Sequence, residues 1–219
     1  RLASSITMRG HEILQKTRDL IEDKGYPVIY GDTDSVFVLL DQSEGEVKAA
    51  GSLLADYLND WWASELMNRY GIPSYLEVEF ETHFEKFFMP TIRGSEKGSK
   101  KRYAGLVRDR VGKQQLVFKG LESVRSDWSP LAREFQIELY RRVYMDERHL
   151  NYISDTAVRL LKGELDDKIS LRRRLRRKLN DYTKNVPPHV RAARLAEAER
   201  LKQGLKPTYA NGGWIEYQM

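Results

Sequence analysis

The sequence predicts an α+β protein, in which an antiparallel sheet packed with helices is followed by a mostly helical part. Residues 27–40 contain two short runs of apolar, β-forming residues around a tight turn, a pattern typical of a hairpin. Segments with apolar residues at helical spacing flank this hairpin and dominate the chain after Phe118. We therefore expect one domain over residues 1–118 and a second over residues 119–219.

The composition bounds the class of protein. The chain has 219 residues, 41% of them apolar, which is enough to build a core. No stretch reaches the roughly 18 consecutive apolar residues of a membrane span, so no membrane partner is expected. The N-terminal residues lack the apolar run of a signal peptide and an initiator Met, so we expect a piece of a longer protein. The absence of cysteine excludes disulfides and zinc–thiolate sites and fits a cytoplasmic location.

Charge is distributed unevenly along the chain. Residues 1–118 carry 16 Lys+Arg and 18 Asp+Glu, a net charge of −2, whereas residues 119–219 carry 21 and 14, a net charge of +7. A basic half beside a half that holds carboxylates suits a metal site next to a polyanion. An ordinary soluble surface is the alternative explanation of the same asymmetry.

Two helices are predicted around the hairpin. The first spans residues 4–24, where apolar residues recur at helical spacing and Gly25 suits the position after a helix. The second spans residues 44–69, where Ser43 and Glu46 have the spacing of a capping box and two adjacent tryptophans fall on the apolar stripe. We expect those tryptophans in the core.

Apolar and polar residues alternate with period two over residues 75–89, which predicts a strand. One face of this strand carries three carboxylates, of which Glu81 is the last, and that face is either solvated or part of an acidic site. The loop 93–102 is basic, and it leads into a hairpin whose strands we place at 103–107 and 115–118. Its cations either hold phosphates or are simply solvated.

The second half is predicted to be mostly helical. Ser129 and Pro130 read as the start of one helix, and apolar periodicity predicts others over 148–162 and 190–203. Residues 171–178 hold six positive charges, and their leucine spacing fits a helix and a strand equally well. Residues 214–217 resemble a strand for which we find no partner in the sequence.

The hairpin tip carries the most informative chemistry. Asp32 and Asp34 lie two residues apart, and Gly31 is expected to ease the turn. Two carboxylates so close repel each other unless a cation compensates, and hard oxygen ligands on a stiff support suit Mg²⁺ or Mn²⁺. A plain turn is the alternative, since Gly, Asp, Thr and Ser are all ordinary turn residues.

Five segments carry a resemblance to a known family, in chain order Tyr30–Ser35, Leu76–Phe84, Lys100–Gly105, Phe118–Glu122, and Tyr182 with Val186–Ala193. Taken in this order, they resemble segments of the family B DNA polymerases, most closely of the bacterial members. The first resembles the family's motif C, and the second a palm strand with an acidic residue. The third resembles a basic motif that contacts the duplex, the fourth the passage from palm to thumb, and the fifth a thumb segment. The resemblance covers essentially the whole chain and implies a palm over 1–118 and an incomplete thumb over 119–219.

The resemblance implies template-directed nucleotidyl transfer with two Mg²⁺ ions, for which Mn²⁺ can substitute. It implies that Asp34 is the main metal ligand, that Asp32 is secondary, and that Glu81 lies at the edge of the site. It also implies that primer–template DNA is held by cations and one aromatic side chain, namely Lys100, Lys101, Arg102, Tyr103, Lys119 and Arg125. The other implied partners are deoxynucleoside triphosphates and a sliding clamp, the latter through a tail beyond Met219.

The chain also departs from the pattern of a complete polymerase. The motifs Asp-x-x-Ser-Leu-Tyr-Pro-Ser and Lys-x-x-x-Asn-Ser-x-Tyr-Gly, which carry the first catalytic aspartate and the nucleotide-binding lysine, do not occur. We therefore expect a fragment of a repair or translesion polymerase that binds DNA but is inactive alone, in a bacterial cytoplasm near the nucleoid. The alternatives are a non-catalytic DNA-binding module on the same scaffold and another palm enzyme, such as a reverse transcriptase or a nucleotide cyclase.

Overall fold

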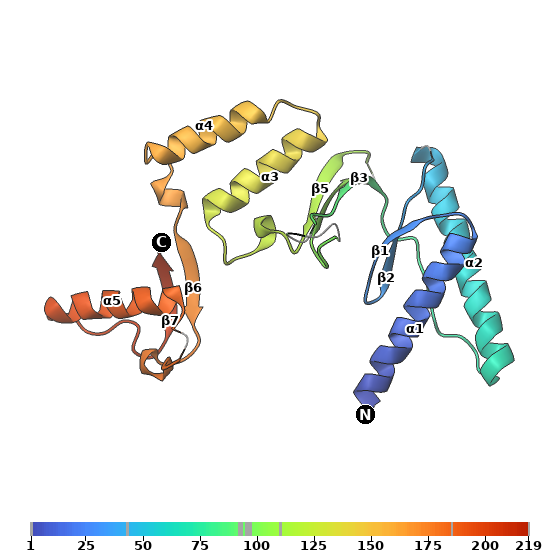
Figure 1. Ribbon diagram of the computed structural model, residues 1–219, viewed down its shortest axis with the longest axis horizontal. Coiled ribbons are helices and arrows are strands. Elements are labelled where there is room, and N and C mark those ends of the chain that lie inside the picture. Colours follow the sequence, from blue (N-terminus) through green and yellow to red (C-terminus); the bar gives the residue numbers. More distant parts are fainter. Residues whose placement is uncertain are drawn as a thin grey trace. The chain divides into compact units, whose positions relative to one another are not determined.

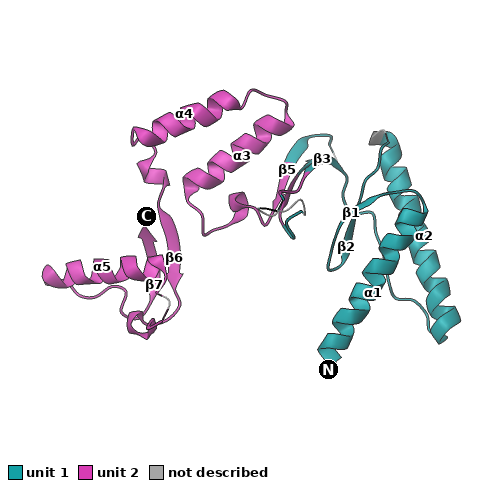
Figure 2. Ribbon diagram, in the orientation of Figure 1, with its two compact units in different colours: residues 1–87, 91–101, 105–115 teal, residues 88–90, 102–104, 116–219 magenta. Residues whose placement is uncertain are grey.

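The computed structural model describes residues 2–42, 44–91, 94, 98–109, 111–184 and 186–218. Within these residues, five α-helices and three small sheets form an α+β arrangement (Figure 1). The predicted α+β class is therefore confirmed, but the described strands form three small sheets in place of the single predicted one. The chain divides into two compact units (Figure 2): unit 1 is 1–87, 91–101 and 105–115, and unit 2 is 88–90, 102–104 and 116–219. None of the described helices has the length and apolar character needed to cross a membrane.

Unit 1 begins with the predicted order of helix, hairpin and helix. These elements are α1 (Leu2–Asp23), β1 (Val28–Asp32), β2 (Ser35–Val38) and α2 (Glu44–Tyr70). The predicted capping residue Ser43 lies outside the described residues. Leu20 and Ile21 of α1 and Leu58 of α2 form a buried core against which both hairpin strands pack. This core fixes the hairpin on one side, so its tip is held on rigid structure.

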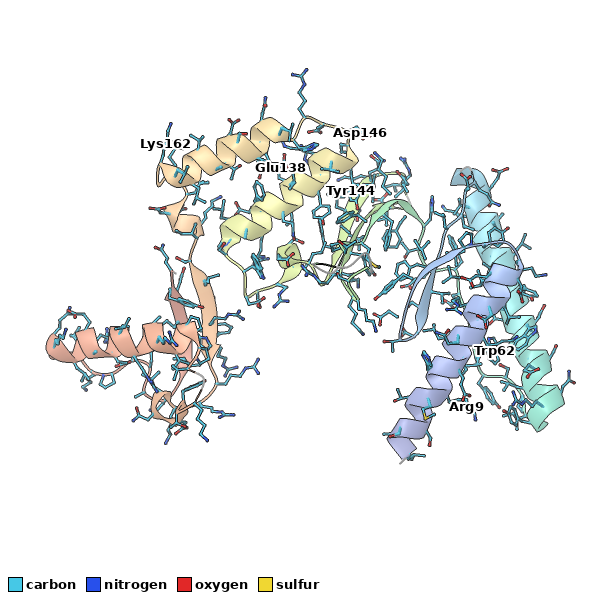
Figure 3. The ribbon with its side chains drawn as sticks, in the orientation of Figure 1. Arg9, Trp62, Glu138, Tyr144, Asp146 and Lys162 are labelled. Atoms are coloured by element: carbon cyan, nitrogen blue, oxygen red, sulfur yellow. The ribbon has the colours of Figure 1, made fainter. Side chains whose placement is uncertain are left out.

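Trp62 of α2 is a core residue, as predicted, and Trp61 is half-buried against the core. Trp62 is buried, its ring lies edge-on to Trp61, and its indole Nε1 donates to the buried Thr17 hydroxyl of α1 over 3.2 Å. Figure 3 shows Trp62 on the side of α2 that faces α1. This hydrogen bond satisfies the only polar group of the indole, so burial of the ring leaves no N–H donor without an acceptor.

The prediction of one strand over 75–89 is wrong in its first part. Only β3 (Phe84–Phe88) is a strand, whereas residues 72–83 are extended without pairing to another described strand. The predicted alternation still holds, because Leu76, Val78 and Phe80 are half-buried and the three glutamates are exposed. The side-chain amide of Asn59 replaces a neighbouring strand: it accepts from Val78 N–H over 2.8 Å and donates to Val78 C=O over 2.9 Å.

The middle sheet has the order β3-β4-β5. The strands β4 (Tyr103–Arg108) and β5 (Gln114–Lys119) confirm the predicted hairpin. Asp109 organises the turn between them, because its carboxylate accepts from the N–H groups of Val111 and Lys113. This is the side-chain behaviour that makes aspartate common in turns.

Unit 2 contains the predicted helices α3 (Pro130–Tyr144), α4 (Leu150–Leu161) and α5 (Pro188–Lys202), with a short 3₁₀ turn at Glu122–Val124. The start of α3 is confirmed, since the Ser129 hydroxyl accepts from Ala132 N–H. Tyr144 at the end of α3, labelled in Figure 3, is buried and donates to the carbonyl of Ala104 over 2.8 Å.

The remaining sheet decides the question left open for residues 171–178. Residues Leu171–Leu175 form β6, which pairs antiparallel with β7 (Gly213–Tyr217). The prediction that the last strand has no partner is therefore wrong: Ile215 lies opposite Arg173, and Trp214 lies opposite Arg174. One face of the pair buries Leu175 and Ile215 against Val190 and Ala193 of α5.

Candidate functional site

The site is built on the β1–β2 hairpin. Tyr30 pairs with Phe37, Gly31 with Val36, and Asp32 with Ser35, so the turn consists of Thr33 and Asp34 alone. The prediction that Gly31 eases the turn is wrong. Thr33 takes the left-handed conformation instead, with φ of +51°, and Gly31 is an ordinary strand residue.

The two aspartates have different surroundings. Asp32 accepts from the Thr33 hydroxyl over 3.0 Å, and its Oδ1 lies 3.2 Å from the Lys101 ammonium. Asp34 accepts from the Ser35 hydroxyl over 3.1 Å, and within the described part of the chain it makes no ion pair. Asp32 is thus paired with a lysine from the basic loop, whereas Asp34 has no basic partner among the described residues.

The basic loop reaches this hairpin through Lys101. Its backbone N–H donates to the Tyr30 hydroxyl over 2.8 Å, and its ammonium lies 3.4 Å from the Thr33 hydroxyl oxygen. Lys100, the preceding residue, is exposed. The structure therefore brings together two segments that are about 70 residues apart in the sequence, the acidic hairpin and the basic loop.

Glu81 is not brought to the aspartates by any contact among the described residues, and its side chain is exposed. Those residues also contain no group of three or more carboxylate or histidine side chains that could hold a metal ion. What the described part of the chain offers to a hard cation is the Asp34 carboxylate, beside an Asp32 already paired with lysine.

Two other predicted DNA-binding cations are engaged by carboxylates. Arg102 is half-buried, and its guanidinium pairs with Glu122, whose other oxygen accepts from Gln136 over 2.9 Å. Burial alone would raise the pKa of Glu122, but the hydrogen bond from Gln136 and the charge of Arg102 together hold it below the usual value. This network connects the last residue of the basic loop to Gln136 of α3, an arrangement that no local sequence signal predicts.

Arg125 is the second of these cations. Its guanidinium makes two hydrogen bonds to Asp127, of 2.9 and 2.6 Å, and Arg173 of β6 donates to the same carboxylate over 3.0 Å. Arg125 above all, with help from Arg173, holds the pKa of Asp127 far below its usual range. Of the remaining predicted contacts, Lys119 is exposed at the end of β5, and Tyr103 is half-buried at the start of β4.

A basic groove of about 540 Å³ lies beside β6. Arg172, Arg174, Arg176 and Arg177 contribute exposed cations to it, and the guanidinium of Arg172 lies over the Trp214 ring at 4.8 Å. His189 lies at the same groove, and burial together with the charge of Arg173 lowers its pKa. Five arginines line the groove against one aspartate, so it suits a polyanion.

Comparison with known proteins gives a consistent result. The model of DNA polymerase family B matches residues 1–209. The chain is 54% identical over 219 residues to "DNA polymerase II" of Escherichia coli (strain K12), covering 99% of this chain and 28% of that protein. It is 32% identical over 206 residues to "DNA polymerase" of Thermococcus kodakarensis, covering 91% of this chain and 11% of that protein.

A third relative, "DNA polymerase" of Thermococcus gorgonarius, is 29% identical over 206 residues, covering 91% of this chain and 24% of that protein. The chain thus spans between about a tenth and just over a quarter of the length of these relatives. The family match, in contrast, extends over nearly the whole chain. By that match, the chain belongs to DNA polymerase family B.

Proposed function

We propose that this chain is part of a DNA-directed DNA polymerase and supplies the C-terminal part of its palm, residues 1–118, and a thumb, residues 119–219. The observation that carries the proposal is the contact between the aspartate hairpin and the basic loop, through Lys101, in a chain of family B. An active site for DNA synthesis must hold a metal cation and a nucleic-acid backbone side by side. The hairpin offers carboxylates for the cation, and the basic loop offers cations for the backbone.

In this proposal Asp34 is the catalytic carboxylate that this chain contributes, because it is exposed and, among the described residues, its carboxylate accepts a hydrogen bond from the Ser35 hydroxyl and makes no ion pair. Two Mg²⁺ ions, or Mn²⁺ in their place, would supply activation of the primer 3′-hydroxyl and neutralisation of the triphosphate. Asp34 fits as a ligand of such an ion. Asp32 and Glu81 have secondary roles, Asp32 as the partner of Lys101 and Glu81 at the edge of the site.

The remaining residues serve to position the DNA. Exposed Lys100 and Lys119 are suited to phosphate contacts, which fix register without reading sequence. Arg102, Tyr103 and Arg125 shape the surface on which the duplex lies, with Arg102 and Arg125 held in place by their carboxylate partners. The exposed arginines of β6 add thumb contacts. We further propose deoxynucleoside triphosphates as substrates, a sliding clamp as partner, a role in repair or translesion synthesis, and a bacterial cytoplasmic location near the nucleoid.

We propose that these 219 residues alone bind DNA without synthesising it, because the motifs for the first catalytic aspartate and the nucleotide-binding lysine do not occur among them. The second candidate, a DNA-binding module without catalysis, is favoured by the same observation. Both aspartates of the hairpin are present, which argues for the polymerase.

The test uses the complete polymerase that contains this chain. Asp34→Ala should abolish primer extension while leaving duplex affinity within about threefold, because the substitution removes a metal ligand rather than a phosphate contact. Glu77→Ala, on the exposed side of the extended segment, is the matched control and should leave extension unchanged. Near-normal synthesis by Asp34→Ala would remove this residue from the mechanism and favour the non-catalytic module.

A further inference from the structure

Lys101 adopts a backbone conformation that is unusual for lysine. Its φ is +61°, in the left-handed region that favours glycine and, less strongly, asparagine or aspartate. A side chain with a β-carbon is strained there, so the conformation persists only where the surroundings impose it. Strain of this kind, beside a candidate site, calls for a group that holds the residue in place.

Tyr30 supplies that group. Its hydroxyl accepts the backbone N–H of Lys101 over 2.8 Å, a good length for such a bond. Its ring is fixed in turn, because it packs against its strand partner Phe37 with the ring centroids 5.3 Å apart. The donor is a backbone atom, so the bond constrains the path of the loop rather than one flexible side chain.

The side chain of Lys101 adds two further contacts to the same hairpin. Its ammonium lies 3.2 Å from Asp32 Oδ1 and 3.4 Å from the Thr33 hydroxyl oxygen. Both partners follow Tyr30 within three residues. Backbone and side chain of Lys101 thus both contact one hairpin, and the Lys101 side chain remains 69% exposed and accessible to a ligand.

We propose that Tyr30 is a positioning residue: its hydroxyl holds Lys101 in the left-handed conformation that places the ammonium beside the aspartate pair, ready for a phosphodiester of bound DNA. This proposal rests on the proposed function, because it requires that DNA binds beside Lys101. It also explains why the two aspartates have different roles: Lys101 pairs with Asp32, so Asp34 remains available to bind a metal ion.

The first measurement needs no DNA. In the 219-residue chain, Tyr30→Phe removes the hydroxyl and keeps the ring that packs on Phe37. Amide hydrogen exchange at Lys101, followed by NMR, should become about 3- to 10-fold faster, because one hydrogen bond is lost. Tyr75→Phe, at a tyrosine that is 92% exposed, is the matched control and should leave this rate unchanged. An unchanged exchange rate in Tyr30→Phe overturns the proposal.

The second measurement is a double-mutant cycle on affinity for a primer–template duplex. Tyr30→Phe and Lys101→Ala should each weaken binding several-fold, and Tyr30→Phe should have no further effect in the Lys101→Ala background. A full effect in that background would overturn the proposal, since Tyr30 would then act independently of Lys101. Faster exchange with DNA affinity unchanged in both single variants would instead refute the proposed DNA contact and leave the backbone constraint standing.

Discussion

At the scale of single residues, two helical glycines of unit 1 have opposite effects on stability. Gly51 of α2 is buried, and a β-carbon there would overlap the ring of Phe80 in the extended segment. Gly10 of α1 is exposed, and a β-carbon there would meet nothing within 4 Å. The first glycine therefore permits close packing of the extended segment on the helix, whereas the second only weakens its helix.

These surroundings predict opposite effects of the same substitution. Gly51→Ala should lower the free energy of unfolding by about 1–3 kcal/mol, because overpacking outweighs the gain in helix propensity. Gly10→Ala should raise it by about 0.5–1 kcal/mol through propensity alone. Urea denaturation of both variants checks the pair. A stabilised Gly51→Ala would show that Phe80 moves aside without cost.

Glu138, labelled on α3 in Figure 3, gives a prediction about pH. Hydrogen bonds from Arg141 and Arg142, of 2.7 to 3.0 Å, hold the pKa of Glu138 at about 2. Because its ionised form is favoured by folding, its contribution to stability is complete above the ordinary pKa of 4.5. That contribution is lost as the pH falls from about 4.5 to about 2.

Glu138→Gln should therefore lower the free energy of unfolding by about 1 kcal/mol at pH 7, and by progressively less toward pH 2. The figure is modest because the arginine partners are about a third exposed. Asp127 and Glu122 also have lowered pKa values, so the informative quantity is the difference between variant and parent at each pH. Glu77→Gln serves as control, and a pH-independent difference would contradict the assignment.

At the scale of elements, β6 and β7 depend on each other across about 40 residues of sequence. Ile215 of β7 is 2% exposed and packs with Leu175 of β6 and Val190 of α5. Ile215→Ala should lower the free energy of unfolding by about 2–5 kcal/mol, since it leaves a cavity in this small core. Glu216→Ala, at the exposed neighbour, should change it by less than about 0.5 kcal/mol.

Guanidinium denaturation followed by circular dichroism measures both variants. Equal, small changes in the free energy of unfolding would mean that β7 adds little to the stability of the unit, and that β6 folds without it.

Some elements of the fold could be predicted from the sequence, and others could not. The helices and the aspartate hairpin were predictable because their burial pattern is local and periodic. Residues 171–175 were not, because leucines four apart fit both a helix and a strand, and the deciding partner lies at Gly213–Tyr217. The alternation over 75–81 reveals one-sided burial, which an asparagine side chain supports as well as a strand does.

For the candidate site, the aspartates and the basic loop were visible in the sequence, but their contact was not. Tyr30 and Lys101 are 71 residues apart, and nothing local signals that a tyrosine hydroxyl accepts a distant N–H. The ion pairs of Arg102 with Glu122 and of Arg125 with Asp127 are likewise set by tertiary packing. Residue type thus predicts which chemistry is present, and the fold decides which groups remain available for it.

At the scale of the whole molecule, the uneven charge of the chain makes a prediction about how it binds DNA. A net charge of +5 would attract a duplex weakly from any side. The exposed arginines along the basic groove concentrate that charge on one unit, beside Trp214. If phosphates bind there, each contact releases counterions, and the logarithm of affinity falls with the logarithm of salt by about 0.9 per contact.

Replacing Arg172, Arg174, Arg176 and Arg177 by glutamine should therefore reduce the salt slope of duplex binding by about 2 to 4. The matched control replaces four exposed lysines on other segments, Lys48, Lys113, Lys162 and Lys206, and changes the net charge equally. Fluorescence anisotropy between 50 and 200 mM salt, a range over which the affinity of such contacts falls steeply, measures both variants. If phosphates contact the groove, the control variant keeps the salt slope of the parent, because net charge alone releases few bound counterions. Equal losses of slope in the two variants would show that the groove has no special role.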